Sequence, residues 1–137
     1  MYQNDPESHL RQLAELTRPL GALSLLTAGL YGKQARFGAK PDTKNLKSIE
    51  RSGRYKGNMN MEVSAYTPRE ITDLLRGAGF NVLDWFGVRI FTDNDKRKIA
   101  KLKLEKLATI LKTEISLSNV EEAKGIGQML HFIARKK

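Results

Sequence analysis

The sequence contains no cysteine and only two histidines, which excludes a disulfide framework and any zinc site built on thiolates. His9 and His131 stand far apart, and neither belongs to a cluster of carboxylates, so we predict no metal site. No apolar run approaches the roughly 20 residues of a membrane span. The polar N-terminal segment does not resemble a signal peptide, and we therefore expect a cytoplasmic protein.

Acidic residues are scarce relative to basic ones. The 137 residues include 24 Lys and Arg but only 15 Asp and Glu, which gives a net charge of +9. Such an excess favours a polyanionic partner, with RNA or DNA as the main candidates. The alternative is a protein that is cationic without any such partner. The length fits one domain with a modest core, so we predict a single domain over residues 1–137.

Apolar periodicity and turn residues divide the chain into alternating helices and strands. The clearest signals are Pro6 at a first helical position, the apolar run at residues 22–30, and the Thr67-Pro68-Arg69-Glu70 capping box. We expect helices at residues 5–18, 68–78, 95–113 and 119–124, the last opened by a capping box over 118–121, and strands at 22–30, 80–92 and 129–134. Residues 31–39 are either a short helix or an irregular basic loop. This alternation predicts an α/β layer structure.

Residues 40–65 show no clear period and are rich in lysine, asparagine, serine and glycine. We predict a long basic loop that acts as a binding loop or lid. Basic residues within and just before this segment, interleaved with aromatic ones, are the best candidate surface for RNA phosphates. The candidates are Lys33, Arg36, Lys40, Lys44, Lys47, Arg51, Arg54 and Lys56. A solvated cationic loop without a ligand is the alternative.

Three segments together resemble the C-terminal half of class I S-adenosylmethionine-dependent methyltransferases. They are residues 5–26 with the Arg18-Pro19-Leu20-Gly21 turn, residues 65–92 (AYTPREITDLLRGAGFNVLDWFGVRIFT) and residues 131–136 (HFIARK). The resemblance implies the fifth, sixth and seventh strands of a Rossmann-like sheet, with the last strand antiparallel, flanking helices and a basic helical insertion. The long insertion, residues 87–91 (GVRIF) and Asp93 are most similar to the tRNA 5-carboxymethoxyuridine methyltransferases.

The resemblance implies methyl transfer from S-adenosylmethionine to tRNA or another RNA. The glycine-rich loop and the acidic residue that bind this cofactor are not in the sequence. We expect them on an N-terminal methyltransferase half, in cis or as a separate chain, and we expect the 137 residues alone to be inactive and to bind no cofactor. The alternatives are a non-catalytic basic module that binds RNA or protein, and a fragment of a small-molecule methyltransferase.

The sequence also departs from the family pattern at two positions. Leu20 replaces a glycine that is usual in the turn before the fifth strand, and we expect this replacement to change the conformation of that tight turn. Gly29 falls near an asparagine that the tRNA-modifying members carry after that strand, so a polar contact there is missing.

We predict that Arg89, Tyr66 and Tyr31 bind the substrate, while the catalytic residues stay unidentified. An arginine within an apolar strand needs an anionic partner, either a substrate carboxylate or a salt bridge to Asp84 or Asp93. The tyrosines fall at the expected C-terminal edges of strands, where an aromatic ring stacks on a base or simply packs. Residues 125–127 (GIG) lack the surroundings of a cofactor loop and predict a turn.

Overall fold

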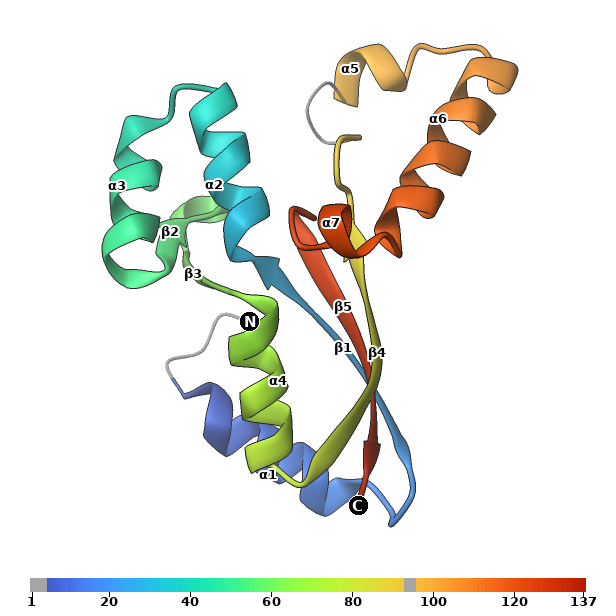
Figure 1. The fold of residues 1–137 in the computed structure, drawn as a ribbon. Helices are drawn as coiled ribbons and strands as arrows, with labels where there is room; N and C mark the ends of the chain where they lie inside the picture. The colour runs from blue at the N-terminus through green and yellow to red at the C-terminus, as the bar shows by residue number, and fades with distance from the viewer. Residues whose placement is uncertain (1–4, 93–95) are drawn as a thin grey trace.

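The computed structural model describes residues 5–92 and 96–137 of the chain. Its strands form one five-stranded mixed sheet in the order β2-β3-β1-β5-β4 (Figure 1). The helices are α1 (Pro6–Leu16), α2 (Leu30–Ala39), α3 (Thr43–Ser52), α4 (Pro68–Gly77), α5 (Lys96–Ile99), α6 (Leu104–Ser118) and α7 (Glu121–Lys124), with a 3₁₀ turn, η1, at Asn58–Asn60. The strands are β1 (Ala22–Gly29), β2 (Arg54–Lys56), β3 (Glu62–Tyr66), β4 (Phe80–Val88) and β5 (Met129–Lys136).

The final strand organises the sheet. β5 runs antiparallel to β1 on one side and antiparallel to β4 on the other, with Met129 opposite both Ala28 and Val88. β1 and β4 therefore run in the same direction. On the far side of β1, β3 adds in parallel with Tyr66 opposite Gly29, and β2 lies antiparallel outside it. The α/β class and the antiparallel last strand are confirmed, but the sheet has five strands rather than the three predicted.

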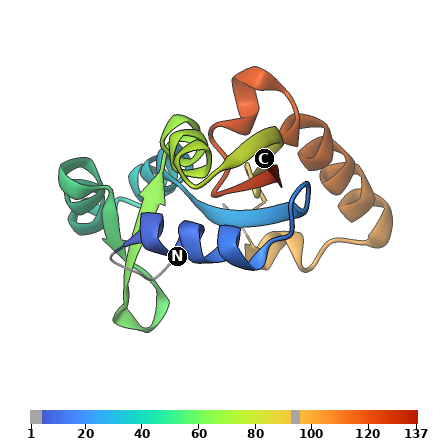
Figure 2. The same ribbon diagram turned by 90° about the horizontal axis from the view of Figure 1, so that it is seen from below.

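The main core lies between the sheet and the helices α1 and α4, which pack against one face of it (Figure 2). Leu10 and Ala14 of α1 are spaced four residues apart, as are Ile71 and Leu75 of α4, so each helix turns one apolar stripe inward. The strands contribute Phe80, Leu130, Phe132 and Ala134. Trp85 closes this core by stacking on Phe132, with ring centroids 5.7 Å apart.

The segment predicted as a loop over residues 40–65 instead forms α3, β2, η1 and most of β3. These elements pack around a second small core, in which the buried residues are Ala28, Phe37, Ile49, Tyr55, Val63 and Ala65. Helix α3 begins because the carboxylate of Asp42 accepts a hydrogen bond from the amide of Asn45 at 3.1 Å. It ends because Gly53 takes a left-handed conformation with φ of 66°. The loop prediction is wrong because these elements are short and each shows only a few apolar residues.

Two other boundaries differ from prediction. β4 ends at Val88, so the predicted strand over 80–92 is too long, and the chain turns at Arg89 with φ of 59°. The predicted helix over 95–113 is divided into α5 and α6, and its expected start at Asp95 lies outside the described residues.

The capping box predicted over 118–121 is also wrong. Helix α6 continues through Ser118, whose hydroxyl donates back to the carbonyl of Ile115 at 2.6 Å instead of capping a new helix. Val120 precedes α7, and no side chain caps that helix.

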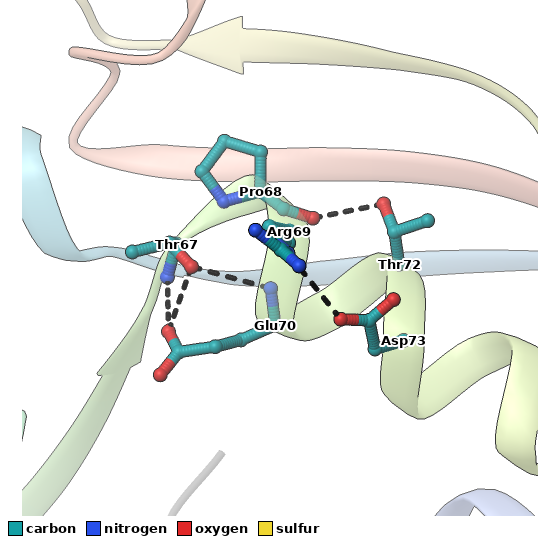
Figure 3. Close-up of polar contacts among 6 residues, drawn as sticks. All are labelled: Thr67, Pro68, Arg69, Glu70, Thr72 and Asp73. Carbon is teal, nitrogen blue, oxygen red and sulfur yellow. Dashed lines mark hydrogen bonds and ion pairs between the residues drawn. The ribbon is translucent and has the colours of Figure 1, made fainter.

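The capping box that opens α4 is confirmed (Figure 3). The amide of Glu70 donates to the hydroxyl oxygen of Thr67 at 3.2 Å, and the carboxylate of Glu70 accepts from the amide of Thr67 at 2.7 Å. Pro68 occupies the first turn, where it needs no amide hydrogen. The helix stops where Gly79 adopts φ of 89°, as the sequence predicts. This cap fixes where the chain leaves β3.

We predict that Thr67→Ala lowers the free energy of unfolding by about 1 kcal/mol, because it leaves the amide of Glu70 without its partner. Urea denaturation followed by circular dichroism measures the change. Thr113→Ala, at an exposed position within α6, is the matched control and should change stability by less than about 0.5 kcal/mol. Equal losses in both variants would show that the capping box does not stabilise α4.

Candidate functional site

The carboxyl ends of β1, β3 and β4 all lie at one edge of the sheet. Gly29 at the end of β1 pairs with Tyr66 at the end of β3, and Val88 at the end of β4 lies opposite the same residue, Met129, as Ala28. Ligands of open α/β sheets bind outside the carboxyl ends of their strands. This edge is therefore the candidate functional site.

All three predicted substrate residues come from segments at this edge. Tyr66 is the last residue of β3, Tyr31 lies in the first turn of α2 directly after β1, and Arg89 follows the last residue of β4. Tyr31 is 49% exposed, so its ring is accessible to a ligand. Tyr66 is half-buried and packs against the main core, so packing accounts for part of its role.

Tyr66 also lines two adjoining hollows. The larger, of about 470 Å³, lies between α1 and α4, and the smaller, of about 370 Å³, extends toward α3; both share Pro6, Tyr66 and Glu70. The larger hollow carries Glu7, Glu70 and Asp73 but only one arginine, Arg11. Its charge is therefore unsuited to phosphate groups, and an RNA backbone would have to approach Tyr66 from another side.

A close contact between glycines closes the middle of the edge. A β-carbon on Gly29 would lie 2.4 Å from the carbonyl oxygen of Gly127, one on Gly32 would lie 2.1 Å from the same oxygen, and one on Gly87 would lie 2.2 Å from the carbonyl of Lys124. A hydrogen bond holds the start of β5 against α2, since the side-chain amide of Gln128 donates to the carbonyl of Gly32 at 2.6 Å. We call Gly29, Gly32, Gly87 and Gly127 the glycine junction.

The glycine junction explains two features of the sequence. Residues 125–127 form the packed connection between α7 and β5, in agreement with the predicted turn. The junction also requires glycine at position 29, because any side chain there would collide with the backbone of Gly127.

We predict opposite effects for alanine at two glycines of the same helix, α2. Gly32→Ala drives a methyl group into the Gly127 backbone and should cost about 1–3 kcal/mol of stability. Gly38→Ala meets no atom within 4 Å and should raise stability by up to about 1 kcal/mol through helix propensity. Thermal or urea unfolding checks both. A Gly32→Ala protein as stable as Gly38→Ala would show that the junction is loose.

The turn that carries Arg89 is held by a residue that the sequence analysis missed. The buried carboxylate of Glu114 on α6 accepts hydrogen bonds from the backbone amides of Ile90, of Phe91 at 3.2 Å and of Thr92 at 3.1 Å. The sequence did contain a signal for this residue. Glu114 lies on the same helix face as the apolar residues Leu107 and Ile110, and a carboxylate buried on such a face needs hydrogen-bond donors. We call this set of bonds the Glu114 clamp.

The partner of Arg89 stays a prediction. Of the two carboxylates expected to pair with it, Asp84 is exposed on β4 and accepts from the amide of Trp85 at 2.8 Å, and Asp93 lies outside the described residues. Arg89 itself is half-buried at the sheet edge rather than in the middle of a strand.

The predicted RNA-binding residues divide into exposed and engaged ones. Lys33 is 7% exposed, with its ammonium 5.6 Å from the centre of the Tyr55 ring, so it packs in the second core and is withdrawn from the predicted interface. Arg36 is half-buried, and Arg54 pairs with Glu62 at 3.2 Å. The exposed candidates are Lys40, Lys44, Lys47, Arg51 and Lys56.

Helix α3 gathers three of these exposed cations. Lys44, Lys47 and Arg51 follow at intervals of three and four residues, so they share one helix face, which we call the α3 basic face. Leu46 and Ile49 lie on the opposite side and pack into the second core. The helical order, which the sequence analysis did not predict, therefore concentrates charge that a loop would have dispersed.

A second group of cations lies around α5 and α6. Arg97, Lys98, Lys101, Lys103, Lys106 and Lys112 are all exposed. Figure 1 shows α2 and α3 on one side of the sheet edge and α5 and α6 on the other. The candidate edge is therefore bordered by positive charge on both sides.

No protein-family model matches this sequence, and no curated protein matches it significantly. Among the helices within residues 5–92 and 96–137, none is long and apolar enough to cross a membrane. The proposal for function therefore depends on the sheet edge, its charges and the sequence resemblance.

Proposed function

We propose that this chain is the substrate-facing, C-terminal portion of a class I S-adenosylmethionine-dependent methyltransferase that acts on tRNA or another RNA. The observation that carries the proposal is the reversed last strand. β5 lies antiparallel between β1 and β4, and this brings the carboxyl ends of those two strands to one edge with Tyr31 and Arg89. The resemblance implies an antiparallel closing strand of this kind after the capped helix and the strand that follows it.

In this proposal the α3 basic face binds RNA phosphates and the sheet edge receives the acceptor nucleotide. The guanidinium of Arg89 would pair with an anionic acceptor group such as a carboxylate, and the exposed ring of Tyr31 would stack on a base. Methyl transfer needs mainly the alignment of acceptor and donor, so positioning residues supply much of the rate.

The cofactor itself does not fit the described residues. For the backbone to approach a dinucleotide-like cofactor closely, the space beside the glycines at a strand end must be free. At this edge, backbone atoms of neighbouring segments occupy the space beside Gly29, Gly32 and Gly87. S-adenosylmethionine would supply the methyl group of the complete enzyme. We assign its binding to an N-terminal portion, in cis or as a separate chain.

The exposed surface supports such a second portion. The accessible area is 8990 Å² for 15.5 kDa, whereas a compact monomer of this mass exposes about 7,200 Å². The excess, about 1,800 Å², is about twice the roughly 800 Å² that one partner contributes to a standard protein interface. On β1, Leu23 and Leu25 pack into the main core, while Leu26 is 53% exposed and Ser24 is also exposed. An N-terminal portion would find the exposed apolar side chain of Leu26 to cover here.

The isolated 137-residue chain should bind S-adenosylmethionine with a dissociation constant weaker than about 1 mM. Isothermal calorimetry measures this, and a tRNA titration in the same buffer shows that the protein is competent. Micromolar cofactor affinity would contradict the assignment of the cofactor to another portion.

RNA binding should depend on the α3 basic face. We predict that the triple variant Lys44→Glu, Lys47→Glu and Arg51→Glu weakens binding to bulk tRNA, measured by fluorescence anisotropy from about 50 to 200 mM salt. The slope of log affinity against log salt should fall by about 3, one unit for each lost phosphate contact. The control triple Arg18→Glu, Arg69→Glu and Arg76→Glu changes the net charge equally but lies on exposed positions of the α1 and α4 side.

The outcomes separate the candidate functions. Equal weakening by both triples would indicate binding through net charge alone. No effect of the α3 triple would favour a small-molecule methyltransferase. RNA affinity that depends on α3, with no methyl transfer even when an N-terminal half is supplied, would favour the non-catalytic basic module. Two observations support that alternative: the glycine junction is closely packed, and the cations on α3 and around α5 and α6 are exposed on this chain.

A further inference from the structure

Helix α6 exposes an apolar stripe that its own chain does not cover. Leu104 is 80% exposed, Leu111 45% and Ile115 70%, and Ala108 between them is also exposed. The intervals of four, three and four residues place all four on one side of the helix, as in the d and a positions of a coiled coil. We call these residues the α6 stripe.

The helix cannot rotate to bury this stripe, because its other side is already committed to the fold. Leu107, Ile110 and Leu117 are half-buried, and Glu114 is buried in the clamp on residues 90–92. Figures 1 and 2 both show α6 at the periphery of the molecule, with no described element beyond it. The exposed leucine and isoleucine side chains therefore face a partner or water.

We propose that the α6 stripe pairs with the α6 stripe of a second copy of this chain, in antiparallel orientation. In that register Leu104 packs on Ile115 of the partner subunit, and Ala108 packs on Leu111 of the partner subunit. Each layer then combines a larger and a smaller or differently shaped side chain, which fills space well. A parallel pair would instead place Ala108 against its own copy and leave a gap.

The charges beside the stripe fit the same orientation. Glu105 and Lys112 each follow a leucine of the stripe and flank it on the same side. Antiparallel pairing brings Glu105 near Lys112 of the partner subunit, and the two-fold symmetry repeats the contact. A parallel pair would place Glu105 and Lys112 of the two copies on opposite sides of the interface, where they could not meet. Self-complementary charge is what selects a second copy as the occupant.

The contact is small, so the dimer is weak and depends on concentration. Two copies of a protein with net charge +9 repel each other, and salt screens that repulsion. Dimerisation should therefore strengthen as salt is raised, the opposite of RNA binding. The proposal does not depend on the function proposed above.

Sedimentation equilibrium of the full chain from about 5 to 500 µM tests the proposal and should show a reversible monomer–dimer equilibrium. Leu111→Glu should raise the dimer dissociation constant about a hundredfold, since each copy loses a buried leucine. Thr113→Glu, exposed on the opposite side of α6, carries the same added charge and is the control. Circular dichroism confirms that both variants keep their helices.

A charge exchange tests the orientation. Glu105→Lys alone and Lys112→Glu alone should each weaken the dimer about threefold to tenfold, and the double variant should restore it. A monomer at every concentration, or equal effects of Leu111→Glu and Thr113→Glu, would overturn self-pairing through the stripe. Failure of the double variant to restore the dimer would overturn the antiparallel register. Neither result bears on the RNA measurements, which use α3.

Discussion

The approach of backbone to backbone at the glycine junction is the constraint on which the candidate edge depends. Gly29 and Gly32 belong to the path from β1 into α2, Gly87 to the end of β4, and Gly127 to the entry of β5. Their contact fixes where three segments distant in sequence leave the sheet. Tyr31 and Arg89 lie directly beside the glycine junction, so the distance between them is set by the backbone contacts of these glycines. Backbone packing, rather than interactions between charged side chains, therefore positions the candidate site.

Charge is distributed in a way that the net value conceals. The hollow beside Tyr66 is bordered by Glu7, Glu70 and Asp73, whereas the exposed cations gather on α3 and around α5 and α6. A polyanion would be repelled from this hollow and attracted to both borders of the sheet edge. The useful quantity is thus the local field at that edge and not the excess of +9 over the whole molecule.

Elements with strong local signals were predictable, and those that depend on a few distant contacts were not. The capping box at Thr67, the left-handed Gly79 and the apolar run of β1 each specify structure within a few residues. Helix α3 and strands β2 and β3 are short, and they are ordered by burying Ile49, Tyr55 and Val63 in a shared core, which no local pattern reports. Tyr31 and Tyr66 were expected at the carboxyl ends of strands and lie there, because strand ends are predictable; Arg89 was expected within a strand and instead lies in the turn after β4. Lys33 was misassigned because helix α2 turns it inward, and Glu114 was missed because its donors lie 22 to 24 residues away.

The Glu114 clamp has a mechanical consequence. One carboxylate holds three successive amides, so the turn after β4 and helix α6 move as a unit or break several bonds together. Where a partner at α6 displaces the helix, the turn after β4 is displaced with it, and any resulting change in affinity at Arg89 is reciprocated at α6 by the same factor. The sheet edge and helix α6 are thus mechanically connected through the buried carboxylate of Glu114.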